Sequence, residues 1–196
     1  ELLTADDLEK QAEAATRTLK PAAVLLLVVN HAGEPTVVFT QRTAHLSAHA
    51  GQISLPGGSS DPDDGTPECT ALREAQEELG IDPARVEVLG RLPEYRTSTG
   101  FVVTPVVGWA EPPLAYHPDP HEVADVFEVP LSFLLDGTNH RYESAFFKGR
   151  TRHYWAMPYG QRFIWGATAG MLVTFHRLMD PNRGDPNRGR TLLLEK

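Results

Sequence analysis

Cysteine and long apolar runs are scarce in this chain of 196 residues. Its single cysteine, Cys69, excludes a disulfide within the chain and a cysteine-rich zinc site. No stretch approaches the roughly 18 consecutive apolar residues that a membrane-spanning helix needs. The length suffices for one domain with its own hydrophobic core. We therefore expect a cytoplasmic protein.

Basic residues are also in short supply. The chain carries 18 Lys and Arg residues against 26 Asp and Glu residues, a net charge of −8. Non-specific binding to nucleic acid or to an anionic membrane needs basic patches, so neither partner is expected. An acidic protein that handles phosphate groups would need a metal ion, or local Arg and Lys side chains, to offset the repulsion.

Apolar runs and turn residues predict one mixed α/β domain over residues 1–179. The run AAVLLLVV at 22–29 has strand length, and a turn at 30–33 returns it to a second strand at 36–40. Pro105 within a strand at 101–109 indicates a sheet edge or a bulge. The other predictions are helices at 4–19, 131–135 and 165–179, strands at 86–92 and 123–129, and a hairpin of 142–147 with 152–157. The tail at 180–196 repeats Asp-Pro-Asn-Arg-Gly twice, which predicts turns or disorder.

The stretch 51–81, GQISLPGGSSDPDDGTPECTALREAQEELGI, joins a turn-rich segment to a predicted helix at 66–79. Glu74, Glu77 and Glu78 share one helical face, because they are spaced i, i+3 and i+4. Arg73 lies four residues before Glu77, within reach of an ion pair. A second stripe, which we expect to face a core, consists of Leu72, Ala75 and Leu79.

Three carboxylates on one helical face repel each other, at roughly 0.2–0.5 kcal/mol for each close pair. The simplest interpretation of such a face is a solvated surface. The alternative is a metal site, because Mg²⁺ takes oxygen ligands and often bridges carboxylates to substrate phosphates. Taken alone, the three Glu residues favour the solvated surface.

The neighbouring residues change that balance, because the stretch resembles the Nudix box, G-x5-E-x7-R-E-U-x-E-E-x-G-U, where U is aliphatic. Residues 73–81, REAQEELGI, fit every specified position of its second half, and Gly57 and Gly58 supply its glycine end. Gly65 stands where the box places its first Glu, and Asp64 is one residue too early. The resemblance implies an α/β fold, the Nudix-type α/β/α sandwich with a mixed, partly antiparallel sheet.

The same resemblance implies a diphosphatase that depends on Mg²⁺ or Mn²⁺. Glu74 and Glu78 lie one helical turn apart and are the candidate ligands of one ion. Glu77 is a candidate for a second ion or for accepting a proton from water. Arg73 would hold a carboxylate in place through its planar donor fork. Glu122, in a later loop, is the candidate for an additional catalytic carboxylate, with a plain surface position as an equal alternative.

The residues upstream of the box resemble a second motif, L-L-T-x-R-[SA]-x3-R-x3-G-x3-F-P-G-G, of the coenzyme A diphosphatase branch of the family. Ser47 replaces the second Arg of this motif, and Leu55 replaces its aromatic residue. The run FVVTPVVG at 101–108 and the DPDD loop inside the box are also similar to that branch. The positions that agree with the motif are Phe39, Thr40, Arg42, Gly51, Pro56, Gly57 and Gly58.

This closer resemblance implies coenzyme A or a derivative as substrate, cut to 3′,5′-ADP and 4′-phosphopantetheine. Arg42 and Arg96 would contact the substrate, and Gly57 and Gly58 would let the backbone approach its phosphates. The departures at positions 47 and 55 leave ADP-ribose, NADH and dinucleotide polyphosphates as alternatives. Gly65 leaves a catalytically silent nucleotide-binding module. The expected partner is a small nucleotide, and the expected state is a monomer or a homodimer.

Overall fold

The computed structural model describes residues 19–44, 51–147 and 149–179. The predicted helix at 4–19, except its last residue, and the repeat-containing tail at 180–196 lie outside these ranges. Among the described residues, no helix combines the length and the apolar character needed to cross a membrane.

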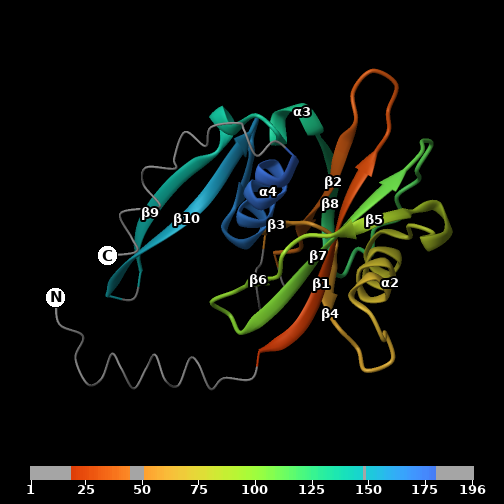
Figure 1. Ribbon diagram of the computed structural model, residues 1–196, viewed down its shortest axis with the longest axis horizontal. Coiled ribbons are helices and arrows are strands. Elements are labelled where there is room, and N and C mark those ends of the chain that lie inside the picture. Colours follow the sequence, from red (N-terminus) through yellow and green to blue (C-terminus); the bar gives the residue numbers. More distant parts are fainter. Residues whose placement is uncertain (1–18, 45–50, 148, 180–196) are drawn as a thin grey trace.

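The centre of the fold is a mixed sheet of eight described strands (Figure 1). Its main path runs β3–β2–β1–β7–β5, while β4 pairs with β1, β6 with β7 and β8 with β2. β1 and β7 are parallel along their whole length, and the other pairs are antiparallel. The strands are β1 Lys20–Val29, β2 Thr36–Arg42, β3 Ile53–Ser54, β4 Gly57–Ser59, β5 Glu87–Arg91, β6 Tyr95–Arg96, β7 Phe101–Ala110 and β8 Val123–Pro130.

Helices lie on both faces of this sheet. α2 (Pro67–Leu79) covers one face, while α4 (Gly166–Met179) lies on the other, next to a second sheet of three strands (Figure 1). The predicted α/β/α sandwich is therefore confirmed, and the small sheet is an addition to it. The remaining elements are β9 Arg141–Phe147, β10 Arg150–Tyr159, β11 Arg162–Trp165, the short helix α3 Leu131–Leu134, and the 3-10 turns η1 Pro83–Arg85 and η2 Gly137–Asn139.

Alternation along β1 divides the core into two layers, as a strand period of two requires. Leu25 and Leu27 face α2, whereas Leu26 and Val28 face α4, and all four are almost fully buried. Each fully buried side chain of this size stabilises the fold by about 1.5–3 kcal/mol. The unbroken apolar run at 22–29 thus reflects a strand covered on both faces.

α2 begins and ends where its sequence provides caps. Thr66 is the N-cap and accepts a hydrogen bond from the amide of Cys69, and Pro67 occupies the first turn. Gly80 closes the helix in the left-handed conformation at φ 67°, and its amide donates to the carbonyl of Gln76. Ala75 and Leu79 are buried against β1, which confirms the predicted helix and its packing on the 22–29 strand.

One local expectation is corrected. β7 is an interior strand, and the carbonyl of Pro105 accepts from the amide of Leu92. The nitrogen of Pro105 therefore faces the same side, at the break between β5 and β6, where the ladder needs no donor. Cys69 is exposed, because it lies on the outer side of the first turn of α2. In α4, Leu172 and Phe175 are buried and Leu178 is exposed.

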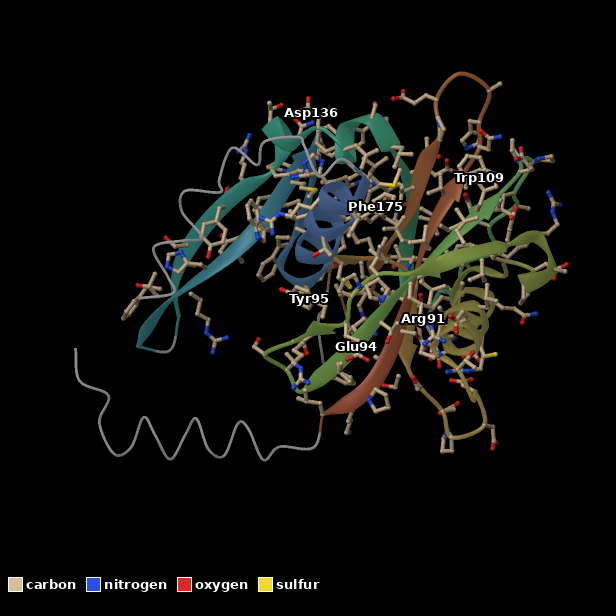
Figure 2. All side chains as sticks on the ribbon, in the orientation of Figure 1. Arg91, Glu94, Tyr95, Trp109, Asp136 and Phe175 are labelled. Atoms are coloured by element: carbon tan, nitrogen blue, oxygen red, sulfur yellow. The ribbon has the colours of Figure 1, made fainter. Side chains whose placement is uncertain are left out.

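Tyr95 and Phe175 lie between α4 and the large sheet (Figure 2). The Tyr95 ring packs directly on Gly170 of α4, where a Cβ atom would come within 2.6 Å of the ring. Glycine in the middle of a helix costs about 1 kcal/mol relative to alanine. Gly170 is therefore retained in α4 by close packing rather than by helix propensity.

We expect Gly170→Ala to lower the free energy of unfolding in urea, because an overpacking cost of about 1–3 kcal/mol exceeds the gain in helix propensity. In a Tyr95→Ala background the same substitution should be neutral or stabilising by up to about 1 kcal/mol. Equal destabilisation in both backgrounds would mean that the Tyr95 ring is not the cause.

Candidate functional site

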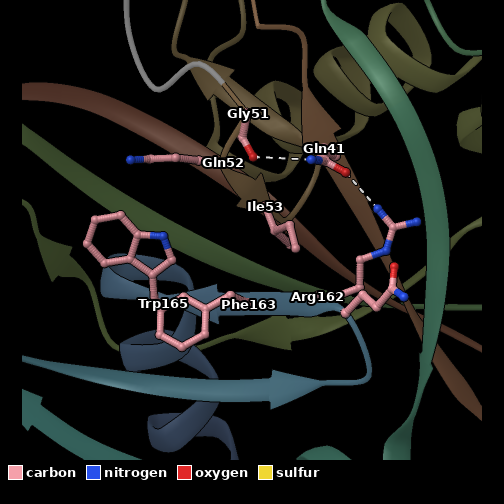
Figure 3. Close-up of a pocket in the computed structure, with 8 residues that line it drawn as sticks. Gln41, Gly51, Gln52, Ile53, Arg162, Phe163 and Trp165 are labelled. Atoms are coloured by element: carbon pink, nitrogen blue, oxygen red, sulfur yellow. Dashed lines mark hydrogen bonds between the residues drawn. The ribbon is translucent and has the colours of Figure 1, made fainter.

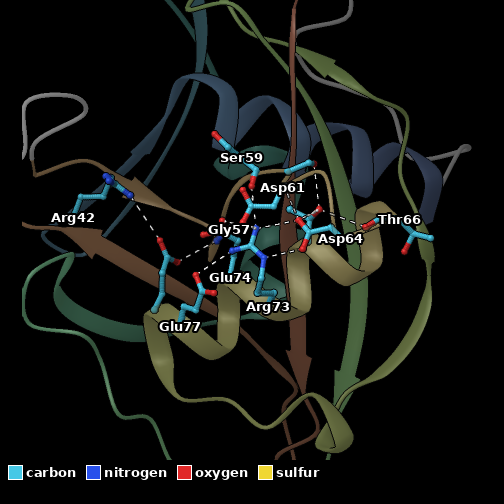
Figure 4. Close-up of polar contacts among 12 residues, drawn as sticks. Arg42, Gly57, Ser59, Asp61, Asp64, Thr66, Arg73, Glu74 and Glu77 are labelled. Atoms are coloured by element: carbon cyan, nitrogen blue, oxygen red, sulfur yellow. Dashed lines mark hydrogen bonds and ion pairs between the residues drawn. The ribbon is translucent and has the colours of Figure 1, made fainter.

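Two carboxylates predicted from the sequence, those of Glu74 and Glu77, contact the guanidinium of Arg73 on α2 (Figure 4). Its Nε and Nη2 atoms donate to the two carboxylate oxygens of Asp64, at 2.8 and 3.0 Å. Nη2 also lies 3.0 Å from Glu74 Oε1, and Nη1 donates to Glu77 Oε2 at 3.0 Å. A further bond from Nη2, to the carbonyl of Ser59, ties the helix to β4. The predicted ion pair between Arg73 and Glu77 is thus present.

Asp64 is the residue that the sequence analysis did not assign. Besides the fork of Arg73, it accepts from the hydroxyl of Thr70 at 2.7 Å and from the amide of Asp61 at 2.8 Å. The Arg73 guanidinium and these donors hold the pKa of the Asp64 carboxyl well below its usual range. The signal was present, because Asp64 follows Gly58 by the interval that the box prescribes between its glycine and its first Glu.

The extra residue of the DPDD loop therefore lies after this acidic position and not before it. Gly65, which occupies the acidic position when the motif is counted back from Arg73, has φ 71° and serves the turn that leads into α2. The acidic position of the motif falls on residue 65 when it is counted back from Arg73 and on residue 64 when it is counted forward from Gly58. In the structure the acidic partner of Arg73 is Asp64, the residue found by counting from the glycine.

Glu78 is buried, with only 4% of its surface exposed. One of its oxygens accepts from the amide of Gly57 at 3.1 Å, and the other lies 3.7 Å from Nη1 of Arg42. Burial raises the pKa of Glu78 to about 7, even though both contacts favour the ionised form, and the nearby Glu74 and Glu122 add to the rise. The expectation of a plain solvated face fails at this position.

Glu74 and Glu77 differ in exposure although they share a helical face. Burial also raises the pKa of Glu74. The side chain of Glu74 is 16% exposed, whereas the side chain of Glu77 is 60% exposed. The carboxylate of Glu74 lies against Gly58, where a Cβ atom would come within 2.5 Å of Oε2. Gly57 is equally constrained, because a Cβ there would meet the carbonyl of Ala23 in β1 at 2.3 Å. Both predicted glycines thus let β4 approach its neighbours closely.

Glu122 is brought to this cluster by the loop that precedes β8. The amide of Asp119 donates to the carbonyl of Glu78, and the amide of His117 donates to that of Leu79, so the loop covers the end of α2. The carbonyl of Glu122 accepts from the amide of Thr43, next to Arg42. The side chain of Glu122 is exposed, and its charge raises the pKa values of Glu74 and Glu78.

The two predicted substrate contacts are placed differently. Arg42, at the end of β2, lies against Glu78 inside the cluster. Arg96 is exposed on β6, which is separated from β4 by β1 and β7. The structure therefore brings together Arg42, Gly57, Gly58, Arg73, Glu74, Glu77, Glu78 and Glu122, and leaves Arg96 outside.

The donor set suits a hard divalent cation. The charges of Glu74, Glu78 and Glu122 repel each other. Among the described residues, Arg73 offsets the charge of Glu74 and Arg42 that of Glu78. In the described part of the chain no three acidic, His or Cys side chains already stand as a closed ligand set. The carboxylate of Glu74 contacts Arg73, and the carboxylate of Glu78 contacts Gly57 and Arg42. Both carboxylates would leave these partners to bind an ion.

A model of the NUDIX domain matches residues 19–148. The chain is 44% identical over 177 residues to the uncharacterized Nudix hydrolase NudL of Citrobacter koseri, covering 87% of this chain and 92% of that protein. It is 40% identical over 177 residues to the protein of the same name in Escherichia coli, with the same coverage.

Among solved structures, a MutT/nudix family protein from Enterococcus faecalis superposes with a TM-score of 0.50. The match covers 90% of this chain and 70% of that one, at 15% identity. At this identity the likeness concerns the fold alone.

We expect the stability of the metal-free protein to fall as the pH rises through about 7. Glu78 has a pKa near 4.5 when unfolded and about 7 when folded, so the native state holds the extra proton between these values. The stabilisation is complete below pH 4.5, is lost above pH 7, and amounts to about 3 kcal/mol.

Urea unfolding at several pH values, with a chelator present, measures this loss. Glu78→Gln should remove most of the decline between pH 5 and 8, since a neutral amide cannot titrate. Glu77→Gln, on the same helix but exposed, is the matched control and should keep the decline. An unchanged decline in the Glu78 variant would assign the titration to another group.

Proposed function

Because the chain belongs to the Nudix hydrolase family, we propose that it is a divalent-metal-dependent hydrolase of a nucleoside diphosphate linked to another group. The observation that supports this most is the pair of like charges on Glu78, which is buried, and Glu74, which is partly buried, beside the two glycines of β4. Such a pair is costly for the fold unless a cation or a proton accompanies it. A ligand set of carboxylate oxygens is the chemistry that Mg²⁺ and Mn²⁺ take.

The reaction needs groups that hold the diphosphate and groups that manage a proton. Glu74 and Glu78 would hold the metal, with Glu77 as a further ligand; the bound ion would neutralise phosphate charge and lower the pKa of water. Water adds to one phosphorus, the bridging P–O bond breaks, and each product keeps one terminal phosphate. Glu77 and Glu122 are the exposed carboxylates at the cluster and are the candidates to accept the proton of the attacking water.

Arg73 acts as a positioning residue in this proposal. Its fork is anchored on Asp64, whose Oδ2 atom also accepts from Thr70 and from the amide of Asp61. This pairing holds the guanidinium in place, and its Nη2 and Nη1 atoms contact Glu74 and Glu77 respectively. The absence of the first Glu of the box was the argument for a silent module. Asp64 answers that argument, because it supplies an acidic partner to Arg73.

Coenzyme A or a derivative is the favoured substrate, with 3′,5′-ADP and 4′-phosphopantetheine as products. One departure from the motif of that branch loses its weight, because Leu55 is 1% exposed and packs in the core rather than toward a ligand. The other departure, Ser47, lies outside the described residues. ADP-ribose, NADH and dinucleotide polyphosphates remain the alternative substrates, to be compared in one assay with Mg²⁺ and with Mn²⁺.

We expect Glu74→Gln and Glu78→Gln each to lower the rate of diphosphate hydrolysis by orders of magnitude while the protein stays folded. Added Mg²⁺ should raise the unfolding temperature of the parent, since a ligand that binds only the native state stabilises it by about 2.7 kcal/mol at a hundred times its Kd. The two variants should show a much smaller rise.

Glu68→Gln is the matched control for these variants. Glu68 lies on the same helix but pairs with Arg91, outside the cluster, so its variant should keep both the activity and the metal effect. Equal metal effects in the parent and both cluster variants would place the metal elsewhere.

Arg42→Ala should lower kcat/KM for coenzyme A and for dephospho-coenzyme A about equally. Arg42 lies against Glu78, which supports a contact with the diphosphate that both substrates share rather than with the 3′-phosphate. A hydrogen bond to a charged group contributes about 1.5–3 kcal/mol, or roughly ten- to hundredfold. Arg96→Ala should affect coenzyme A alone, because Arg96 can reach only a phosphate distant from the cluster. A loss confined to coenzyme A in the Arg42 variant would contradict this placement.

A further inference from the structure

A cavity among the described residues lies outside the carboxylate cluster. It has a volume of about 650 Å³, within the range of small-molecule sites, and lies between the β2–β3 edge of the large sheet and β11 of the small sheet (Figure 3). Two contacts fix its walls relative to each other. Nη1 of Arg162 donates to Oε1 of Gln41 at 2.6 Å, and the hydroxyl of Thr168 donates to the carbonyl of Ile53 at 3.3 Å.

One wall of the cavity is aromatic. Phe163 and Trp165 stand two residues apart on β11 and so share one face of the strand, opposite the fully buried Ile164. Their side chains are 43% and 38% exposed, and both line the cavity. The ring of Tyr154 meets Trp165 edge to face, with centroids 5.5 Å apart, and this contact fixes the indole from behind.

The remaining wall is polar but carries little net charge. Among the described residues, Arg162 is the cationic residue that lines the cavity. Its guanidinium is already paired with Asp125, bonded to Gln41 and stacked over the ring of Phe127 at 4.4 Å. The other polar side chains are the amides of Gln41, Gln52 and Gln161. Amides offer both donors and acceptors to a neutral ring edge. A phosphate group would therefore find the guanidinium of Arg162 already paired with a carboxylate.

The cavity and the carboxylate cluster are joined through two consecutive residues of β2. Gln41 lines the cavity, whereas Arg42 reaches Glu78, and the β2–β8 register shifts between them. The backbone of Arg42 is bonded to Gly51 and Gln52, which also line the cavity. A ligand whose diphosphate lies at Arg42 could therefore place its other end in the cavity by crossing this edge.

We propose that this cavity binds a neutral, planar heteroaromatic ring, the nucleobase of a nucleotide, stacked on Trp165 and Phe163 and hydrogen-bonded to the amide of Gln41. The inference rests on the proposed function in one respect, namely that a nucleotide is the ligand. It assigns the recognition of the base to the face of the sheet opposite α2, away from the carboxylates.

Adenosine, guanosine, cytidine and uridine are the probes that test the proposal, by calorimetric titration of the full chain with a chelator present. At least one nucleoside should bind saturably, while ribose 5-phosphate, which has a phosphate and no base, should not. Trp165→Ala should weaken the binding roughly 5- to 150-fold, the range for one base stacked on an aromatic side chain. Trp165→Phe should retain most of it.

Phe146→Ala is the matched control, because Phe146 is 76% exposed on β9 and does not line the cavity. It should bind the nucleoside as the parent does, and circular dichroism with thermal unfolding verifies that every variant is folded. The proposal is overturned if no nucleoside binds, if ribose 5-phosphate competes, or if Trp165→Ala binds as tightly as the parent.

The outcome is separable from that of the proposed function. A nucleoside has no diphosphate and the titration contains no metal, so binding does not depend on hydrolysis. A protein that binds a nucleoside through Trp165 but cleaves no diphosphate keeps this inference and refutes the enzyme. If the parent cleaves diphosphates and the Trp165→Ala variant binds the nucleoside as tightly as the parent, the proposed enzyme activity stands and the proposed nucleobase site is refuted.

Discussion

The pairing of Arg73 with Asp64 is the contact on which the geometry of the site depends. A guanidinium fork that grips a carboxylate with two hydrogen bonds fixes both the position and the plane of the arginine. Asp64 is in turn held by Thr70 of the helix and by the amide of Asp61, so the loop after β4 and the first turns of α2 form one unit. Glu74 and Glu77 take their orientation from the arginine that this unit immobilises.

That constraint leaves part of the negative charge uncompensated. Arg73 is shared by four carboxylates, those of Asp61, Asp64, Glu74 and Glu77. Among the described residues, the ionised form of Glu78 is supported by Arg42 at 3.7 Å and by the amide of Gly57. A raised pKa at a buried carboxylate reports a folded state that would be more stable with the group neutral. Functional sites accept such a cost, because the same unbalanced charge is what attracts a ligand of opposite sign. The apolar contacts of Ala75 and Leu79 on β1 offset that cost within the same helix.

The sequence sufficed for features that are local or periodic. The run at 22–29 led to the strand that the structure shows, and the apolar stripe of Ala75 and Leu79 led to the helix packed on it. The spacing of the three Glu residues placed them on one face of that helix. Features that depend on contacts between segments far apart in the sequence could not be predicted. The exposure of Glu77 and the burial of Glu78 differ because β4 and the loop before β8 cover only one of them. The cavity at Trp165 needs β11 to meet β3, which no local pattern encodes.

The two faces of the sheet carry different chemistry, and β2 is where they meet. Successive residues of a strand point to opposite faces, so Gln41 and Arg42 belong to different layers while being covalently adjacent. The face under α2 gathers charge, and the face beside β11 offers aromatic rings and amides with the charge of Arg162 already neutralised. A ligand with an anionic centre and a neutral aromatic end would contact both faces only if it crossed this edge of the sheet. The separation also keeps the aromatic wall away from the carboxylates, so either site can be altered by substitution without removing a contact from the other.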